Sequence, residues 1–166
     1  MPQVEARVRV AVDPATAFAV SQTTGPTRLR WDPFIRRQHF LDGATTAGRG
    51  VRTFTRSRHG LSMISRYGSY APPAPGRDTG NVGMTMERGP WFFETFGGGW
   101  RFVPDGEGGT VATWKYTFSC RPAWARPVLE RLGSWLLGRD IRRRIAGFAN
   151  GCSDPEVLAA ARSGSG

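Results

Sequence analysis

Two side chains in an aromatic stretch near the middle of the chain could do acid–base or hydrogen-bonding chemistry. Glu94 lies among Phe92, Phe93 and Phe96. A carboxylate in such apolar surroundings has a raised pKa and could act as an acid or a base. The alternative is that Glu94 points outward or pairs with an arginine. Tyr116 lies between aromatic residues of one strand face, and its hydroxyl, if buried, needs either a ligand carbonyl or a backbone group as partner.

Other kinds of chemistry have no support in the sequence. His39 and His59 are the only histidines, and no group of potential ligands has the spacing of a metal site. No GxSxG nucleophile motif is present, and the glycine runs do not open a helix after a strand, as a nucleotide loop would. Cys120 and Cys152 form no CxxC motif. We therefore predict no metal, no cofactor and, from the expected reduced cysteines, a cytoplasmic protein.

A long antiparallel hairpin is expected to position the tyrosine. Two aromatic and β-branched runs within residues 89–120 flank the glycine-rich turn at 105–109, which is typical of a hairpin. Side chains alternate across a strand. Trp114, Tyr116 and Phe118 therefore share one face of the returning strand, and Trp100 and Phe102 share one face of the outgoing strand. An aromatic face of this size must be covered, and it is either an ordinary core or the wall of a cavity.

The rest of the chain predicts further strands and helices around this hairpin. Alternation of apolar and polar residues predicts strands at 4–12, 35–41, 51–58, 61–70 and 81–87. Asp13 and Pro14 predict the start of a short helix over 15–21, and 27–30 form another helical turn. On the strand at 61–70 the apolar phase favours Tyr67 over Arg66 for the interior, and no arginine is assigned there.

Residues 123–149 form the only long helical segment that the sequence predicts. Its apolar residues recur at three- and four-residue steps; they are Val128, Leu132, Trp135, Leu136, Ile141, Ile145 and Phe148. Pro127 is tolerated only in a first helical turn, so the helix is expected to start near Ala125.

This order of elements predicts an α+β fold in which a curved antiparallel sheet wraps around a long C-terminal helix. We expect a single domain over residues 1–152 and a C-terminal tail over 153–166, with a short helix at 154–162 and disorder from Ser163 to Gly166. No apolar run has the length of a membrane span, and the N-terminus has no signal-peptide core.

The formal net charge of +10 would suit nucleic acid or an anionic membrane surface. The basic residues are spread along the chain, however, so we do not expect nucleic-acid binding as the main role. The densest cluster is Arg139, Arg142, Arg143 and Arg144. It is either a solvated face that supports the end of the helix or a patch for transient contact with a membrane surface. The sequence does not assign an oligomeric state.

Several motifs, in this order and spacing, resemble a known superfamily. They are Asp13–Phe18, Trp31–Phe34, Gly89–Trp91, Trp100–Pro104 and Gly109–Val111. The chain is similar over roughly residues 4 to 150 to the START-like helix-grip fold of the SRPBCC superfamily. Within it, the chain most resembles the polyketide cyclase/dehydrase and lipid-transport group, which includes coenzyme Q-binding proteins.

The resemblance implies a deep apolar cavity between the sheet and the C-terminal helix. The residues expected to bind a ligand there are Trp31, Tyr67, Met84, Met86, Phe96, Trp100, Phe102, Trp114 and Phe118. The implied function is that of a cyclase/dehydrase-type protein that acts on a polyketide-like or other apolar intermediate, with Tyr116 and Glu94 as the catalytic candidates. One alternative is a non-catalytic carrier or chaperone of a lipid or quinone; another is an interaction module with a filled core.

Overall fold

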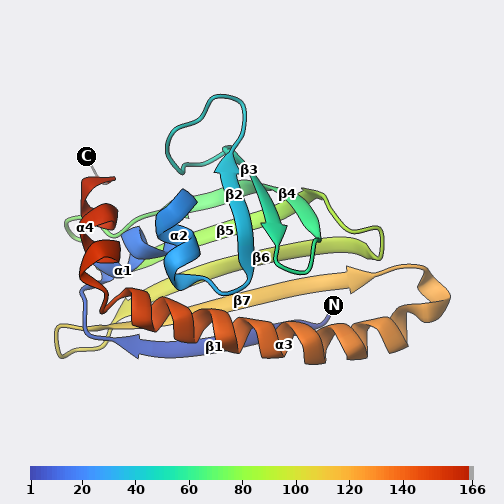
Figure 1. Cartoon of the computed structure of the whole chain (residues 1–166). Coiled ribbons are helices and arrows are strands. Elements are labelled where there is room, and N and C mark those ends of the chain that lie inside the picture. The colour runs from blue at the N-terminus through green and yellow to red at the C-terminus, as the bar shows by residue number, and fades with distance from the viewer. Residues whose placement is uncertain (165–166) are drawn as a thin grey trace.

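The computed structural model describes residues 1–164, and these contain one seven-stranded antiparallel sheet (Figure 1). The strand order is β1-β7-β6-β5-β4-β3-β2. The strands are β1 (Gln3–Val10), β2 (Ile35–Phe40), β3 (Arg52–Ser57), β4 (Ser62–Ala71), β5 (Gly80–Arg88), β6 (Phe93–Pro104) and β7 (Thr110–Cys120). The curved sheet and the long C-terminal helix confirm the predicted helix-grip fold.

The helices lie at one end of the sheet and along its β1–β7 side. They are α1 (Pro14–Ser21), α2 (Gly25–Trp31), the short 3-10 helix η1 (Ala123–Ala125), α3 (Arg126–Gly151) and α4 (Pro155–Ser163). Helix α3 packs on β1 and β7, whereas α1, α2 and α4 gather near its C-terminal end (Figure 1). Of the predicted disordered stretch, Ser163 closes α4, and residues 165–166 lie outside the described residues.

Helix α4 packs against the rest of the molecule although it follows the predicted domain end. Asp154 caps it by accepting a hydrogen bond from the Glu156 amide. Val157 and Ala161 are buried in the main core, and α4 contacts both α1 and α2. The segment after Cys152 therefore adds apolar surface to the core.

Strand pairing between β6 and β7 builds the aromatic inner face that the sequence predicts. Trp100 lies opposite Trp114 in the register, and their rings stack with centroids 4.1 Å apart. Gly97–Gly99 form part of β6, where they pair with β5 and β7. A side chain at Gly99 would come within 2.6 Å of the Val82 carbonyl oxygen, so glycine lets these strands approach.

Two apolar clusters lie between the sheet and the helices. The main one is rich in aromatic rings and includes Trp31, Trp100, Phe102, Trp114 and Phe148. The second lies under the N-terminal half of α3 and has Phe93, Phe118 and Cys120 at its centre. Phe96 and Leu137 pack against both clusters and are themselves only half-buried.

Helix α3 does not use its apolar residues as one continuous stripe. Ile141, Ile145 and Phe148 are buried against the sheet, whereas the apolar residues of the first half that the sequence grouped with them are exposed. Those exposed residues are Val128, Leu132, Trp135 and Leu136. The reason is helical phase: Val128 and Ile141 are thirteen residues apart, which at 3.6 residues per turn places them on nearly opposite sides.

Candidate functional site

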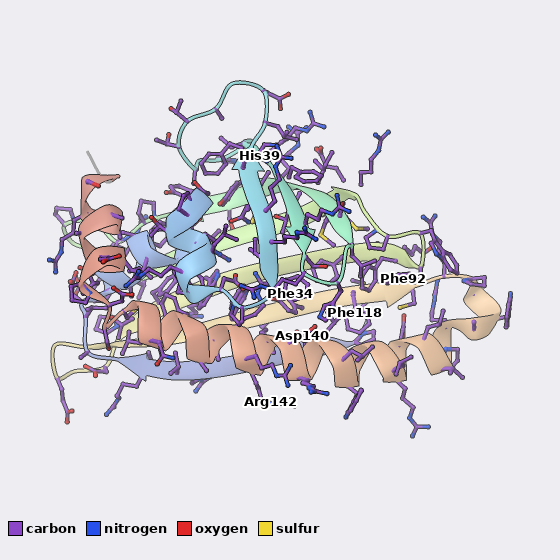
Figure 2. All side chains as sticks on the ribbon, in the orientation of Figure 1. Phe34, His39, Phe92, Phe118, Asp140 and Arg142 are labelled. Atoms are coloured by element: carbon purple, nitrogen blue, oxygen red, sulfur yellow. The ribbon has the colours of Figure 1, made fainter. Side chains whose placement is uncertain are left out.

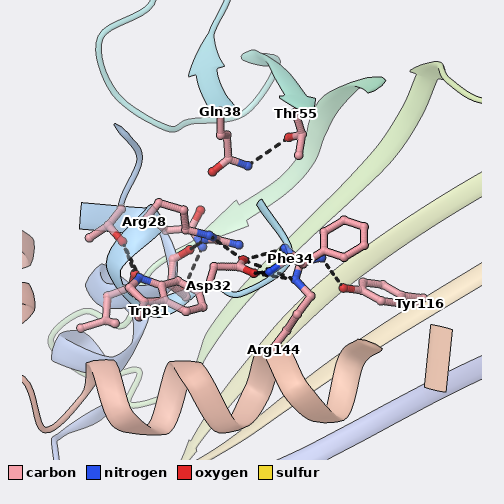
Figure 3. A network of polar contacts seen from close by, with 12 residues as sticks. Arg28, Trp31, Asp32, Phe34, Gln38, Thr55, Tyr116 and Arg144 are labelled. Carbon is pink, nitrogen blue, oxygen red and sulfur yellow. Dashed lines mark hydrogen bonds and ion pairs between the residues drawn. The ribbon is translucent and has the colours of Figure 1, made fainter. Parts of the chain in front are cut away.

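A buried cluster of charged side chains joins α2 to α3 on the inner side of the sheet (Figure 3). Arg144 of α3 donates from Nη2 to Oδ2 of Asp32 at 2.7 Å and from Nε to Oδ1 at 3.1 Å. Arg28 of α2 donates from Nε to Oδ2 of Asp32 at 3.0 Å and from Nη1 to the Ser21 carbonyl oxygen at 2.6 Å. All three charged side chains are buried.

The backbones of α2 and α3 pass close to each other, and this brings Arg144 within reach of Asp32. A side chain at Gly147 would lie 2.1 Å from the Trp31 carbonyl oxygen, and one at Gly151 would lie 2.9 Å from the Trp31 Cβ. Asp32 directly follows α2, and its Oδ1 also accepts a hydrogen bond from the Phe34 amide. Two glycines one helical turn apart thus let α3 pass over the end of α2 and set Arg144 beside Asp32.

Both guanidinium groups lie over aromatic rings and make cation–π contacts with them. The guanidinium of Arg144 lies 4.3 Å from the centroid of Trp114 and 4.7 Å from that of Phe34. That of Arg28 lies 4.2 Å from the Trp31 ring. Such cation–π contacts are strongest where water is excluded. They stabilise two buried cations that face a single carboxylate.

The pKa of Asp32 reflects a balance between burial and its two partners. Burial would raise this pKa, but the charges of Arg144 and Arg28 and their hydrogen bonds outweigh burial, so the pKa lies below the ordinary value. The same carboxylate raises the pKa of Arg144 against the opposing effect of burial. The three side chains therefore stay ionised at neutral pH, and two positive charges against one negative leave the cluster at +1.

Tyr116 extends this cluster toward the sheet. Its hydroxyl oxygen accepts a hydrogen bond from Nη1 of Arg144 at 2.6 Å (Figure 3). Burial raises the pKa of Tyr116 to about 12, although the Arg144 charge opposes that rise. The phenol is therefore neutral near pH 7. Its own proton has no acceptor among the described residues, and it is free to be donated.

Half-buried apolar side chains lie near the Arg144–Tyr116 pair. The ring centroid of Phe96 lies 5.4 Å from that of Tyr116, and Phe34 is in contact with the Arg144 guanidinium. Leu137 of α3 packs on the same cluster. Unlike the fully buried rings of Phe102 and Phe148, these side chains are partly exposed to solvent.

The nine residues predicted to bind a ligand gather on the inner side of the sheet. Trp31, Tyr67, Trp100, Phe102 and Trp114 are buried in the main cluster. Phe118 is buried in the second cluster, and Met84, Met86 and Phe96 are partly buried against the two clusters. Tyr67 donates its hydroxyl proton to Oε1 of Gln22 at 3.0 Å, and burial raises its pKa to about 12. Their role in ligand binding stays a prediction.

Glu94 lies apart from this group. Its side chain is exposed at the start of β6 and accepts a charge-assisted hydrogen bond from Arg126. The apolar surroundings considered for Glu94 are therefore absent, and the arginine pairing given as the alternative is what the structure contains. The physical reason is that a bulge between Phe93 and Thr95 changes the side-chain alternation at this point of β6.

Sequence reasoning missed the two inward arginines. The sequence places Arg144 in one basic cluster with Arg139, Arg142 and Arg143, yet Arg144 is buried while the other three are exposed. The phase of the helix carries the signal: Arg144 follows Ile141 by three residues and precedes Phe148 by four, so it belongs to the buried face.

Two surface hollows lie outside the interior. One, of about 270 Å³, is lined by Pro26, Thr27, Arg30, Glu156 and Val157. The other, of about 500 Å³, lies between the β1–α1 connection, the β4–β5 loop and the β6–β7 turn. Neither is lined by a predicted ligand-binding residue. On the inner side of the sheet, aromatic side chains of the main cluster lie beside partly buried ones such as Phe96 and Met84.

Residues 1–164 contain neither a metal-ligand group nor a membrane-spanning helix. In this part of the chain, histidine, cysteine and carboxylate side chains form no group of three that could hold a metal ion. None of its helices combines the length and the hydropathy of a membrane span.

Comparison with known proteins places the chain in a family. The family model described as "Polyketide cyclase / dehydrase and lipid transport" matches residues 1–151. The chain belongs to this family. The match confirms the resemblance drawn from the sequence motifs. Among the curated proteins searched, none matches the chain.

Solved structures share the fold of this polyketide cyclase/dehydrase and lipid-transport family member at low sequence identity. A protein from Thermus thermophilus is 16% identical, with a TM-score of 0.69 over 96% of this chain and 99% of its own. A START superfamily protein from Mycobacterium smegmatis is 14% identical, with a TM-score of 0.69 over 91% and 97%. The di-domain ARO/CYC BexL of the BE-7585A biosynthetic pathway is 10% identical, with a TM-score of 0.64 over 94% of this chain and 48% of BexL.

Proposed function

We propose that the protein binds an apolar, carbonyl-bearing molecule against Tyr116 and acts on it as a polyketide cyclase/dehydrase-type protein. The observation that carries this proposal is the Arg144–Tyr116 hydrogen bond within an apolar interior. The family and the likeness to an aromatase/cyclase structure support the same reaction class.

Tyr116 would polarise a ligand carbonyl as a hydrogen-bond donor. The phenol accepts from the Arg144 guanidinium, so its own O–H becomes a stronger donor toward a ligand oxygen. Because its pKa is raised to about 12, the tyrosine keeps its proton at neutral pH and does not act as a base. A fixed donor in a water-poor site stabilises the negative charge that develops on a carbonyl oxygen during ring closure.

The charge of the site favours the same class of ligand. The buried cluster of Arg28, Asp32 and Arg144 carries a net charge of +1. Burial of an uncompensated charge is unfavourable, and an enolate or other partly negative oxygen beside Tyr116 would reduce that cost. Poly-β-ketones and their enols combine such oxygens with an otherwise apolar or aromatic body.

Half-buried side chains would give the ligand its room. Phe96 and Leu137 lie between the two apolar clusters, and Met84 and Met86 of β5 are flexible and only partly buried. A planar ligand could replace contacts that these side chains now make with each other. The predicted ligand-binding residues would then act as a template that holds a flexible chain in one folded shape.

The second candidate is a non-catalytic carrier of a lipid or quinone. The fully formed Asp32–Arg144 pair favours it, because the ion pair occupies the one buried carboxylate of the cluster and leaves it unsuited to proton abstraction. A carrier would use Tyr116 only to hold a ligand oxygen. In both cases we propose a cytoplasmic protein, supported by the two free cysteines.

The test compares the wild-type protein with Tyr116→Phe on a linear poly-β-ketoacyl thioester, with products separated by chromatography and mass spectrometry. We expect the wild-type protein to yield one main cyclised product. Tyr116→Phe should shift the mixture toward the products that form without protein. Glu94→Gln serves as the control, because its exposed pair with Arg126 lies outside the site.

The outcomes separate the two candidates. If Tyr116→Phe weakens binding of a hydroxynaphthoquinone probe while the wild type leaves the product mixture unchanged, the protein is a carrier. If the wild type neither changes the mixture nor retains an apolar molecule in native mass spectrometry, both candidates are wrong.

A further inference from the structure

The outer side of the first half of α3 exposes large apolar side chains. Val128, Leu132 and Trp135 follow one another at four- and three-residue steps, so they share one side of the helix. Trp124 of η1 precedes them by four residues and is 86% exposed, and Trp135 is 60% exposed. We call the following set the tryptophan face: Trp91, Trp124, Val128, Leu132, Trp135 and Leu136.

Trp91 belongs to the same end of the molecule although it lies in the β5–β6 connection. Its carbonyl oxygen accepts a hydrogen bond from Arg121, and the Phe92 carbonyl accepts one from the Arg121 amide. Arg121 is three residues before Trp124, so the connection is tied to the start of η1. The Trp91 side chain is 70% exposed. The outer side of η1 and α3 thus exposes two tryptophans, and Trp91 adds a third at the same end of the molecule. So much exposed apolar surface is unusual on a soluble monomer and indicates an interaction surface.

Arginines continue the same helix side beyond the tryptophan face. Arg139 follows Trp135 by four residues, and Arg142 and Arg143 follow Arg139 by three and four. Figure 2 shows Arg142 pointing away from the sheet on the outer side of α3. All three are exposed, and none takes part in an ion pair among the described residues. Arg131 is likewise exposed within the apolar half.

We propose that the tryptophan face docks the protein on an anionic lipid bilayer surface, with α3 lying in the plane of the headgroups. Tryptophan side chains are favoured at the boundary between headgroups and acyl chains. Leu132 and Val128 would enter the same layer as an interfacial helix does. Arg139, Arg142 and Arg143 would reach lipid phosphates with their long side chains.

Charge argues against a second copy of this chain as the occupant. Each copy carries a net charge of +10, and symmetric packing through this face would bring two sets of unpaired arginines close together. Of the acidic groups nearby, Glu94 pairs with Arg126 and Glu130 accepts a hydrogen bond from the Cys120 amide. Asp140, between Arg139 and Arg142 in the sequence, is half-buried, and one carboxylate does not balance three exposed arginines. An anionic surface supplies the charge that this face lacks.

The test measures binding of the full chain to two kinds of vesicle, phosphatidylcholine alone and phosphatidylcholine with one third phosphatidylserine. We expect binding to the anionic vesicles that weakens with added salt. Brominated acyl chains should quench the exposed tryptophans, whereas the buried Trp31, Trp100 and Trp114 should be little affected. The Tyr116→Phe variant should bind vesicles as the wild type does, so this result is independent of the proposed function.

Arginine variants of α3 test the electrostatic part of the vesicle binding. Replacing Arg139, Arg142 and Arg143 with glutamine should weaken binding by about a hundredfold, because each arginine near such a surface adds about fivefold. The matched control replaces three exposed arginines of β2 and β3 with glutamine, namely Arg36, Arg37 and Arg56, and should change binding far less.

Replacing Trp124 and Trp135 with serine should weaken binding about tenfold or more and reduce the quenching to the part that Trp91 contributes. Leu29→Ser on α2 is the apolar control. Equal losses in the arginine variant and its control would overturn the proposal, since binding would then depend on net charge alone. Sedimentation as a dimer that Trp135→Ser dissociates, or retention by single-stranded DNA in place of vesicles, would overturn it as well.

Discussion

At the scale of single residues, Asp32 has the largest electrostatic effect on the interior. It is fully buried between Arg28 and Arg144 and contacts both guanidinium groups. Removal of one partner from a buried ion pair leaves the other charge without compensation. Asp32 therefore holds the end of α2 against α3 and also fixes the arginine that contacts Tyr116.

Asp32→Asn should lower the free energy of unfolding by about 3–5 kcal/mol, because two buried guanidinium groups would lose their carboxylate. Urea denaturation measures this change. Asp42→Asn is the control, since Asp42 is an exposed partner of Arg52, and its loss should change stability little. A similar, small effect for both variants would show that the buried pair does not stabilise the fold.

The response to acid follows from the lowered pKa of Asp32. The folded protein keeps this carboxylate ionised to lower pH than the unfolded chain does, so its contribution is present above the ordinary value of 3.8 and is lost as pH falls through the lowered pKa. We expect unfolding free energy to fall below about pH 4 in the wild type. The Asp32→Asn variant should show a flatter dependence in that range; an unchanged slope would contradict the assignment.

At high pH the two buried tyrosines lower the stability of the fold, because their pKa values are raised rather than lowered. Burial raises the pKa of both Tyr67 and Tyr116 from 10.0 to about 12. Their contribution to stability is therefore complete below pH 10 and is lost as pH rises toward 12. We expect phenolate absorbance from these residues to appear together with unfolding. Full titration of all three tyrosines near pH 10 in the folded protein would contradict the burial of Tyr67 and Tyr116.

At the scale of elements, the crossing of α2 and α3 depends on small residues of α3. Gly147 faces the Trp31 carbonyl oxygen so closely that no Cβ fits. Movement of α3 away from α2 would lengthen the Arg144–Asp32 contact and shift the partner of Tyr116. The packing of two helices thus sets the chemistry of a strand residue.

Gly147→Ala should destabilise the protein by about 1–3 kcal/mol or more, since the added carbon must displace backbone. Gly138→Ala on the same helix is the matched control. A Cβ there would meet only ordinary contacts, at 3.5 Å from Arg142 and 3.9 Å from Val4. The control should be neutral or more stable by up to about 1 kcal/mol, because alanine favours helix. Thermal and urea unfolding measure both variants. Equal effects of Gly147→Ala and Gly138→Ala would show that α3 does not cross α2 as closely as described.

At the scale of the whole molecule, α4 closes the end of the structure where α1, α2 and the C-terminus of α3 meet (Figure 1). Val157 is fully buried there and Ala161 almost so. The domain that folds as a unit is therefore proposed to extend through α4, beyond the boundary at Cys152 expected from the sequence.

Removal of residues 153–166 should lower the free energy of unfolding by about 2 kcal/mol or more, from the loss of buried Val157 and the exposure of its neighbours. A chain shortened after Ser163, which keeps α4, is the control and should retain wild-type stability. If both shortened chains unfold at the same urea concentration as the full chain, α4 adds nothing to the core.

Much of the inner wall could be predicted from the sequence, because strand alternation is a local property. The period of two placed Trp100, Phe102, Trp114 and Tyr116 on one face, and the structure has them there. Glu94 could not be placed in this way, since one extra residue at the β6 bulge reverses the alternation.

The amino-acid sequence by itself determined the order of the elements, the antiparallel hairpin and the long final helix, because periodicity and turn residues act over a few neighbouring positions. Helical phase groups Arg144 with Ile141 and Phe148, but only the tertiary structure decided that this side of α3 faces the sheet, that Trp124 and Trp135 face outward, and that Arg144 meets Asp32. Those outcomes depend on how closely α3 approaches α2 and the sheet, and that distance is set by residues far apart in the chain, such as Gly147 and Trp31.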